Sequence, residues 1–418
     1  MLKKSALWLK NNTNTLESIG SLLIAATPIA LVAGRAAADV AVSIAAILFL
    51  FDSIRNNRWS WAKEPWSIAA LSLWAFGIAR EGLLSQGAYP ITETLAWVRY
   101  IIFAASVKTW ALATTQSRKR LLISTITAVA FLSADGLFQY IFGKDIFGRP
   151  RTELSNIGVF RLTGLYRRPI LGITIANLFA PAIFWLLEEK KIKASATLAI
   201  LCMTTVFLSG DRMGLMMAIA IMGVWGLLLI KEIRKKWMIA AIAVILSLAL
   251  AVSAPDMAKR QIASTAKTIT NLTSSAYWMA WKSAWDVGKD NLAFGVGIRQ
   301  FRVTCPDEKY GPLIDEKTGY SRCYNHPHNI YMEWFAEYGI VGLIGMIALS
   351  ATILAEIIRR IARGSTSPLL LGVGMMLAIR LLPVFASTSF FSSWSAIPFW
   401  LALGWAMSYP TIPPSCRT

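Results

Sequence analysis

The sequence predicts an all-α integral membrane protein with about twelve transmembrane helices and one large external loop that carries short helices. Of its 418 residues, 56% are hydrophobic and only 16% are charged, whereas soluble domains carry about 25% charged residues. The apolar residues form continuous runs, most of them close to the roughly 20 residues that span a bilayer. This composition excludes a soluble enzyme. The net charge of +19 does not indicate nucleic-acid binding, because the basic residues stand in short clusters between the apolar runs.

Twelve apolar runs predict the helices in order along the chain. They are residues 17–34, 37–54, 66–83, 94–114, 120–142, 169–187, 192–209, 212–230, 237–254, 329–355, 366–388 and 393–409. Twelve spans place both termini on the same side of the membrane. No small-residue cleavage site follows the first run, which therefore predicts an uncleaved first helix.

The basic clusters predict the orientation. If the N-terminus is cytoplasmic, every cytoplasmic connection carries at least three basic residues, as the positive-inside rule requires. These residues are Arg55, Arg58 and Lys63; Arg118, Lys119 and Arg120; Lys190, Lys191 and Lys193; Lys231, Arg234, Lys235 and Lys236; and Arg359, Arg360 and Arg363.

The segment between the ninth and tenth predicted helices is much longer than the usual connection. It divides the chain into helices one to nine (1–254), a large loop (255–328) and helices ten to twelve (329–418). Loops of this length are commonly functional. The predicted orientation places this loop on the non-cytoplasmic side of the membrane.

One helix is predicted inside the large loop, over Ser275–Asp290. Its Trp278, Trp281 and Trp285 recur at helical spacing. We expect this aromatic stripe to pack on the bundle or to rest in the lipid interface. A platform on which sugars stack is the alternative.

The large loop also holds two of the four cysteines, Cys305 and Cys323. An oxidising compartment permits them to form a disulfide, and two free thiols are the alternative. A disulfide would fix the segment that leads to the two histidines of the chain, His326 and His328. A zinc site usually needs three or four protein ligands, so this pair alone predicts no metal site.

Arginines are concentrated at the same predicted face of the membrane. They are Arg80, Arg99, Arg161, Arg167, Arg168, Arg212, Arg299, Arg302 and Arg380. Guanidinium groups bind phosphate in a bidentate manner, so we expect some of them to bind a lipid-linked pyrophosphate. For each one, a structural or snorkelling role is the alternative. His328 would supply a general base; a packed polar residue or helix cap is the alternative there.

One motif joins these features. His328-Asn329, nine further residues and Gly339-Ile340-Val341-Gly342 resemble the His-Asn motif of the bacterial O-antigen ligase family. The match is complete in spacing and stands at the junction of a large loop and the next helix, as in that family. The predicted topology, Arg161–Leu165, Ser209–Arg212 and Gly295–Gly297 resemble the family as well.

The resemblance implies a reaction and its residues. The family transfers a polysaccharide from undecaprenyl pyrophosphate to a sugar hydroxyl of lipid A-core at the periplasmic face, by an inverting displacement. It uses no nucleotide, metal or other cofactor. By the resemblance, His328 activates the acceptor hydroxyl, with Asn329 beside it, and Arg212 holds the pyrophosphate. Arg161, Arg299 and Arg380 are the further candidates for the pyrophosphate site.

Two positions depart from the family pattern. Members of the family often have an arginine four residues before the aromatic residue of the loop helix, where this chain has Tyr277 before Trp281. We expect Arg299 or Lys282 to supply the missing charge. Some members have an acid where this chain reads Ser387-Thr388-Ser389. These departures leave a polymerase of the same superfamily open as an alternative to the ligase.

The helix after His328 carries Glu333 and Glu337 four residues apart, hence on one face. Either of them, or a backbone carbonyl, is a candidate partner that orients His328. A place on the helix surface or the binding of backbone amides is the alternative for the two glutamates. Gly339, Gly342 and Gly345 are expected to allow close packing of helices.

A transporter and a membrane scaffold are the two alternatives to an enzyme. A transporter of lipid-linked sugars would show two similar halves or broken helices at the membrane midplane, and the sequence shows no such duplication. A membrane scaffold would not need the His-Asn motif. An enzyme is therefore favoured over both.

Overall fold

The computed structural model describes residues 2–85, 88–154, 159–232, 252–363, 367–383 and 387–409. Most of the predicted run 237–254 lies outside these residues, and so do Arg234, Lys235 and Lys236 before it. Within them the chain is almost entirely helical, with one two-stranded hairpin. The predicted helical class is therefore confirmed.

The N-terminal helices overlap the five predicted runs. They are α1 (Leu2–Ala33), α2 (Arg35–Arg55), α3 (Pro65–Leu84), α4 (Ala88–Ser106) and α5 (Thr115–Phe142), with short turns η1 (Ser60–Lys63) and η2 (Val107–Ala111). Helix α1 begins well before the run 17–34, and α4 begins and ends earlier than the run 94–114. Local signals set the bounds of α5. The Thr114 side chain accepts a hydrogen bond from the Ser117 amide at its start, and Gly143 ends it with a φ of 76°.

The remaining helices of the bundle differ from the predicted runs at two places. They are α6 (Leu171–Ala176), α7 (Phe179–Glu188), α8 (Ile192–Leu208), α9 (Arg212–Glu232), α14 (Ile330–Ala362), α15 (Pro368–Arg380) and α16 (Ser393–Met407). The predicted run 169–187 is interrupted between α6 and α7, and the run 366–388 ends as a helix at Arg380. Hydropathy alone locates neither break, because apolar residues continue past both.

Seven helices in the described part of the chain are long and apolar enough to cross a membrane. They are Thr15–Ala33, Arg35–Arg55, Pro65–Leu84, Thr115–Phe142, Leu171–Glu188, Arg212–Leu229 and Ile330–Ala362, and two shorter apolar helices are Ile192–Leu208 and Pro368–Arg380. The chain is thus a multi-pass membrane protein. A total of twelve spans stays a prediction.

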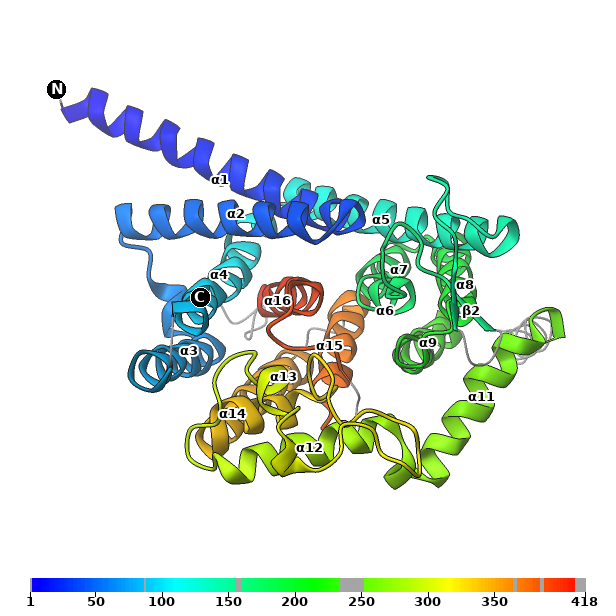
Figure 1. The fold of residues 1–418 in the computed structure, drawn as a ribbon. Coiled ribbons are helices and arrows are strands. Elements are labelled where there is room, and N and C mark those ends of the chain that lie inside the picture. Colours follow the sequence, from blue (N-terminus) through cyan, green and yellow to red (C-terminus); the bar gives the residue numbers. More distant parts are fainter. Residues whose placement is uncertain are drawn as a thin grey trace.

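Helix α16 forms the centre of the molecule. Figure 1 shows it enclosed by the other helices, and nearly all of its residues are buried. A helix that is apolar on every side is expected in such a position. Trp400 and Trp405 are among its fully buried side chains.

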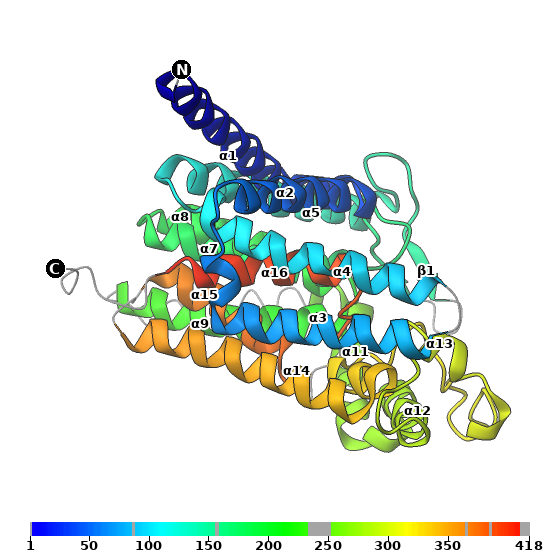
Figure 2. The same cartoon turned by 90° about the vertical axis from the view of Figure 1, so that its left-hand side faces the viewer.

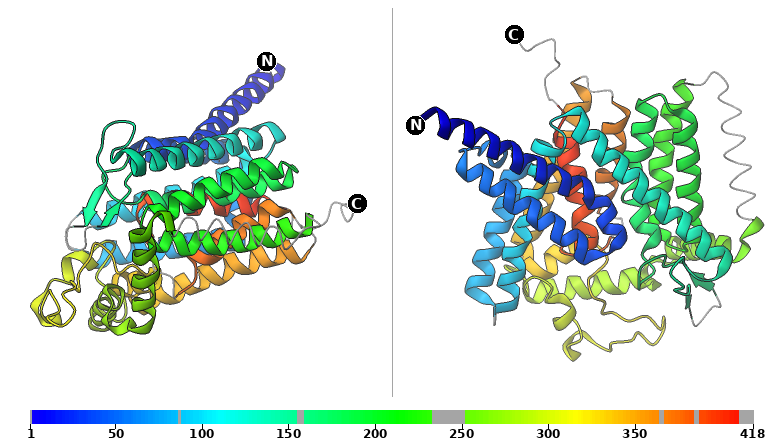
Figure 3. Two further views of the ribbon diagram at one scale, coloured as in Figure 1. Left: turned by 90° about the vertical axis from the view of Figure 1, so that its right-hand side faces the viewer. Right: turned by 90° about the horizontal axis from the view of Figure 1, so that it is seen from above.

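The large loop covers one end of the bundle. It contains α11 (Pro255–Thr270), η3 (Leu272–Ser274), α12 (Ala276–Asp290), α13 (Phe301–Thr304) and η4 (Glu308–Tyr310). In Figure 2 these helices and strand β1 gather at the same end, and in the view from above in Figure 3 α12 lies across the ends of the long helices. The helix predicted at Ser275–Asp290 is confirmed as α12, whose first turn is capped by the Ser275 side chain. Helix α11 was not predicted.

A short antiparallel hairpin lies at this end as well. Its strands are β1 (Thr152–Leu154) and β2 (Val159–Arg161), and Thr152 pairs with Arg161. The pairing fixes the backbone of Arg161, the last residue of β2, at the end of the bundle that the large loop covers.

Backbone contacts hold the large loop on the first turns of α14. The amides of Val296 and Gly297 donate to the carbonyls of Ala336 and Glu337, at 3.0 and 2.8 Å. Gly295 has a φ of 64°, and a Cβ there would lie 2.3 Å from the Glu337 backbone. Only glycine fits so close an approach.

Helix α14 is kinked at Gly339, which has a φ of 65°. The kink frees the amide of Ile340, which donates to the Leu292 carbonyl of the loop at 2.8 Å. A Cβ at Gly345 would lie 2.3 Å from Leu73 of α3. The predicted close packing of helices is therefore confirmed at Gly345, whereas Gly339 lies against the Leu292 and Ala293 backbone of the large loop.

Candidate active site

His328 stands at the end of the large loop, two residues before α14. Its φ is 57°, a left-handed conformation that is uncommon for a residue with a side chain. Ser387, which follows α15 in the chain, donates its amide to the His328 carbonyl at 2.8 Å. The backbone of His328 is therefore fixed by a segment almost sixty residues away in sequence.

Asn329 holds the start of α14. Its Oδ1 accepts hydrogen bonds from the amides of Tyr331 and Met332, at 2.9 and 3.1 Å, and its Nδ2 donates to the Pro383 carbonyl at 2.5 Å. This is an N-cap that also binds the segment after α15. Asn329 thus supports the position of its neighbour His328.

Aromatic rings surround the His328 side chain. The ring centroids of Tyr277, Tyr324 and His326 lie 5.9, 5.3 and 4.3 Å from it. Burial in these surroundings lowers the pKa of His328 to about 4. The imidazole is therefore neutral at physiological pH and able to accept a proton.

The second histidine, His326, has a different environment. Its Nε2 lies 3.2 Å from the Ser387 carbonyl, which can only accept a hydrogen bond. Nε2 therefore carries the proton in this contact. Burial first, and the neighbouring His328 second, lower the pKa of His326 to about 3.

Arg212 begins α9 at a tight turn. Asp211 caps the helix, because its Oδ1 accepts from the Gly214 amide at 3.1 Å. Gly210 has a φ of 69°. The Arg212 Nη1 donates to Thr268 Oγ1 of α11 at 3.1 Å. The Ser209–Arg212 motif thus places a guanidinium at a helix N-terminus, which itself favours anions.

Two further arginines stand beside this turn, and with Arg212 we call them the arginine cluster: Arg161, Arg212 and Arg260. Arg161 Nη2 lies 3.8 Å from Asp211 Oδ2 and donates to the Pro169 carbonyl at 2.9 Å. Arg260 of α11 donates Nε to the Gly210 carbonyl at 3.2 Å. Burial first, and the charges of Arg161 and Arg212 next, lower the pKa of Arg260.

The ring of Tyr277 connects the arginine cluster with His328. The Arg212 guanidinium carbon lies 5.7 Å from the centroid of the Tyr277 ring, and the same ring contacts His328. Tyr277 comes from α12, Arg212 from α9, and His328 from the start of α14. Three separate parts of the chain therefore bring a neutral imidazole and a group of cations to one place.

Arg299 and Arg380 have other partners. Arg299 Nη1 lies 3.1 Å from Glu93 Oε2, and its Nη2 donates to the Phe391 carbonyl at 2.7 Å. Arg380 is buried, where it donates to Asn177 and Ser395. The contacts of Arg299 tie the large loop to α4 and to the segment before α16, and those of Arg380 lie within the bundle. Neither residue belongs to the arginine cluster.

The two glutamates of α14 bind backbone amides. Glu333 accepts from the Phe390 amide and Glu337 from the Arg299 amide, both at 2.7 Å. Binding of backbone amides is the alternative role that the sequence analysis gives for Glu333 and Glu337. In the described part of the chain, neither carboxylate contacts the ring of His328, which is held by its aromatic neighbours and its backbone.

The aromatic stripe of α12 packs only partly on the bundle. Trp285 packs on Phe335 of α14 with ring centroids 5.0 Å apart, yet both Trp278 and Trp285 retain substantial exposure.

The part of the chain that the structure describes contains no group of three or more His, Cys, Asp or Glu able to hold a metal.

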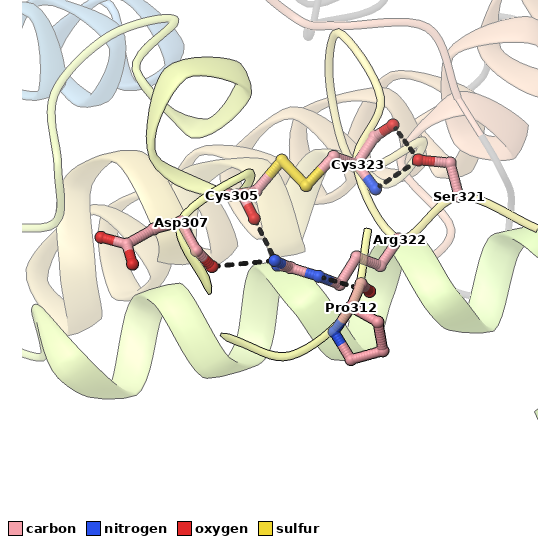
Figure 4. Close-up of a disulfide and its surroundings, with 6 residues drawn as sticks. All are labelled: Cys305, Asp307, Pro312, Ser321, Arg322 and Cys323. Carbon is pink, nitrogen blue, oxygen red and sulfur yellow. Dashed lines mark hydrogen bonds between the residues drawn. A yellow bond between two sulfur atoms is a disulfide. The ribbon is translucent and has the colours of Figure 1, made fainter. Parts of the chain in front are cut away.

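A disulfide between Cys305 and Cys323 closes a loop shortly before the histidines (Figure 4). Inside this loop Arg322 is buried and donates to the carbonyls of Cys305, Asp307 and Pro312. The guanidinium thus organises the loop from within, and the covalent bond ties its two ends together.

Replacing Cys305 and Cys323 with Ser should loosen this loop. A disulfide that closes a loop of this length contributes about 3 kcal/mol by constraining the unfolded chain. We expect limited proteolysis of the purified double variant to cut within residues 306–322 at least ten times faster than in the wild type. Cys202→Ser, in a buried helix position, is the control. Equal cleavage rates in the variant and the wild type would show that Arg322 alone maintains the loop.

Sequence reasoning missed one member of the cluster, Arg260, because α11 was not predicted. A signal was present: Pro255 and Asp256 are typical of the first turn of a helix. Met257 and Gln261, four residues apart, are both buried, as expected of one face of an amphipathic helix.

Residues 197–347 match a family model described as O-antigen ligase. The matched segment includes Arg212, Arg260, Tyr277 and His328, and therefore most of the site. Among curated proteins no sequence matches the chain.

Proposed function

We propose that the chain is an O-antigen ligase of the bacterial inner membrane, because residues 197–347 match the family model described as O-antigen ligase. It would transfer a polysaccharide from undecaprenyl pyrophosphate to lipid A-core at the periplasmic face. The observation that carries the proposal is the contact of Tyr277 with both Arg212 and His328.

His328 would act on the acceptor. As a neutral imidazole it takes the proton of the sugar hydroxyl while the hydroxyl oxygen attacks the anomeric carbon of the donor. The fixed backbone of His328 and its aromatic neighbours hold the ring in place without a carboxylate. Its proton is afterwards released to water or to the departing phosphate.

The arginine cluster would act on the donor. As the new bond to the anomeric carbon forms, the bond from that carbon to the phosphate oxygen breaks, and the configuration inverts. Negative charge then grows on the leaving pyrophosphate, and preformed guanidinium groups stabilise this charge. The donor is already activated, so the reaction needs no nucleotide.

A complementation experiment tests the proposed function. The chain is expressed in a strain that lacks its own ligase but makes lipid-linked O-antigen, and lipopolysaccharide is examined on gels. We expect capped lipopolysaccharide with the wild-type chain and accumulation of long lipid-linked polymer with His328→Ala. If the strain instead lacks its polymerase, and the chain converts single-unit caps to long chains there, the protein is a polymerase. If the His328→Ala variant still performs the step that the wild-type chain performs, the catalytic role of His328 is rejected.

The pH dependence of transfer follows from the burial of His328. Since its pKa is lowered to about 4, the base stays unprotonated from neutral pH down to about 5. We expect kcat/KM to be constant over this range and to fall as the pH drops through about 4. Initial rates of the purified enzyme, with samples returned to neutral pH to check for unfolding, measure this. A fall centred near 6.5 would indicate a solvated histidine instead.

A further inference from the structure

We propose that Arg260 of α11 completes the diphosphate-binding site and supplies the positive charge that the loop helix lacks at Tyr277. The ligand class is the diphosphate of a polyprenyl-linked glycan. The inference rests on the proposed function and adds to it a residue that neither the His-Asn motif nor the loop helix contains.

The position of Arg260 supports this role. Its Nε donates to the carbonyl of Gly210, so its guanidinium lies against the turn from which Arg212 projects. A Cβ at Gly210 would lie 3.1 Å from Arg260 Nε and 3.5 Å from Arg161 Cγ. The absence of a side chain at Gly210 therefore favours the close approach of Arg260 to the start of α9, and Arg161 lies at ordinary contact distance from the same position.

The charges of the cluster are not balanced by its nearest carboxylate. Asp211 is the acid beside the three guanidinium groups, and its two oxygens already accept from the amides of Gly214 and Ile173. The like charges of Arg161 and Arg212, together with burial, lower the pKa of Arg260. Such a group of cations is expected where an anion binds.

A buried donor in the same cluster lacks an acceptor. Arg161 Nε is buried and hydrogen-bonds to no group among the residues that the structure describes. Buried polar groups are nearly always paired in native proteins. An oxyanion placed between Arg161, Arg212 and Arg260 would accept this hydrogen bond and offset the repulsion.

Lys282 and Arg299, the two residues expected to replace the missing family arginine, form ion pairs with other residues. Lys282 forms an exposed ion pair with Asp286 at 3.2 Å. Arg299 forms its ion pair with Glu93. Arg260, by contrast, donates to the turn that precedes Arg212, and the Arg212 guanidinium lies 5.7 Å from the ring of Tyr277, the residue at the family position. The charge therefore comes from the preceding helix, α11.

Binding of polyprenyl diphosphate without a glycan tests the proposal. The full-length protein in nanodiscs is titrated with this lipid, and the wild type is compared with Arg260→Gln, Arg260→Lys and Arg212→Ala. Arg260→Gln removes the charge but keeps an amide that can donate to the Gly210 carbonyl. Lys259→Ala is the matched control, because Lys259 is an exposed cation on the same turn of α11.

We expect Arg260→Gln to weaken binding about tenfold or more, as loss of a charged hydrogen bond does, with a smaller loss for Arg260→Lys and none for Lys259→Ala. The salt dependence of binding should also become less steep in Arg260→Gln. If Arg212→Ala loses affinity while Arg260→Gln binds like the wild type, Arg260 is not part of the site, although the proposed function stands. If the wild type does not bind the lipid, the proposed function itself fails.

Discussion

Replacing His328 with Ala should lower kcat for glycan transfer by about 10²–10⁴-fold, the usual contribution of a general base. Affinity for the lipid-linked donor should change little, because the proposed donor contacts come from the arginine cluster and not from His328. Initial rates and donor titrations with purified protein separate the two effects.

A second variant removes the concern that the backbone is disturbed at this position. Asn tolerates the φ of 57° that His328 adopts, so His328→Asn keeps the local fold but lacks a suitable base. It should be as slow as His328→Ala. Asn325→Ala, an exposed position in the same segment, should retain full activity. Near-normal rates in His328→Asn would contradict the assignment of the base.

Replacing Arg212 with Ala should lower kcat/KM by about 10²–10³-fold, since a preorganised donor to a developing oxyanion contributes that much. Both donor affinity and the rate of the chemical step should fall, because the proposed contact of the guanidinium with the diphosphate exists before and during bond cleavage. Steady-state kinetics with varied donor concentration measure the two components.

The matched control for Arg212 is an arginine at the same end of the molecule. Arg168 is exposed, and Arg168→Ala should act like the wild type. Arg212→Lys keeps the charge but not the forked geometry of the guanidinium. Its kcat/KM should lie between the values of the wild type and Arg212→Ala. If Arg168→Ala were impaired as severely as Arg212→Ala, the effect would come from general surface charge rather than from a built site.

Much of the architecture could be predicted from the sequence, because apolar runs and basic clusters report directly on the membrane. The helix α12 was also predictable, since Ser275 caps it and its tryptophans recur at helical spacing. Helix α11 was not predicted, because it is amphipathic and lies among polar residues. The break between α6 and α7 escaped prediction because the flanking residues are equally apolar.

The site was only partly predictable for a similar reason. The His-Asn motif and the turn before Arg212 are local patterns that one sequence displays. The contact of Tyr277 with Arg212 and His328 joins three distant segments, and no local pattern encodes it. The partner of His328 was sought among acids one or two turns away, yet Glu333 and Glu337 bind amides that come from the large loop and from the segment after α15.

The central claim is that this chain alone moves a glycan from a polyprenyl diphosphate to a lipid A-core hydroxyl. Purified protein in nanodiscs, incubated with labelled lipid-linked glycan and lipid A-core, tests it most directly. The account predicts one polyprenyl diphosphate released for each glycan joined to lipid A-core, and loss of both products with His328→Asn. Glycan joined instead to a second lipid-linked glycan, or equal transfer by His328→Asn, would contradict it.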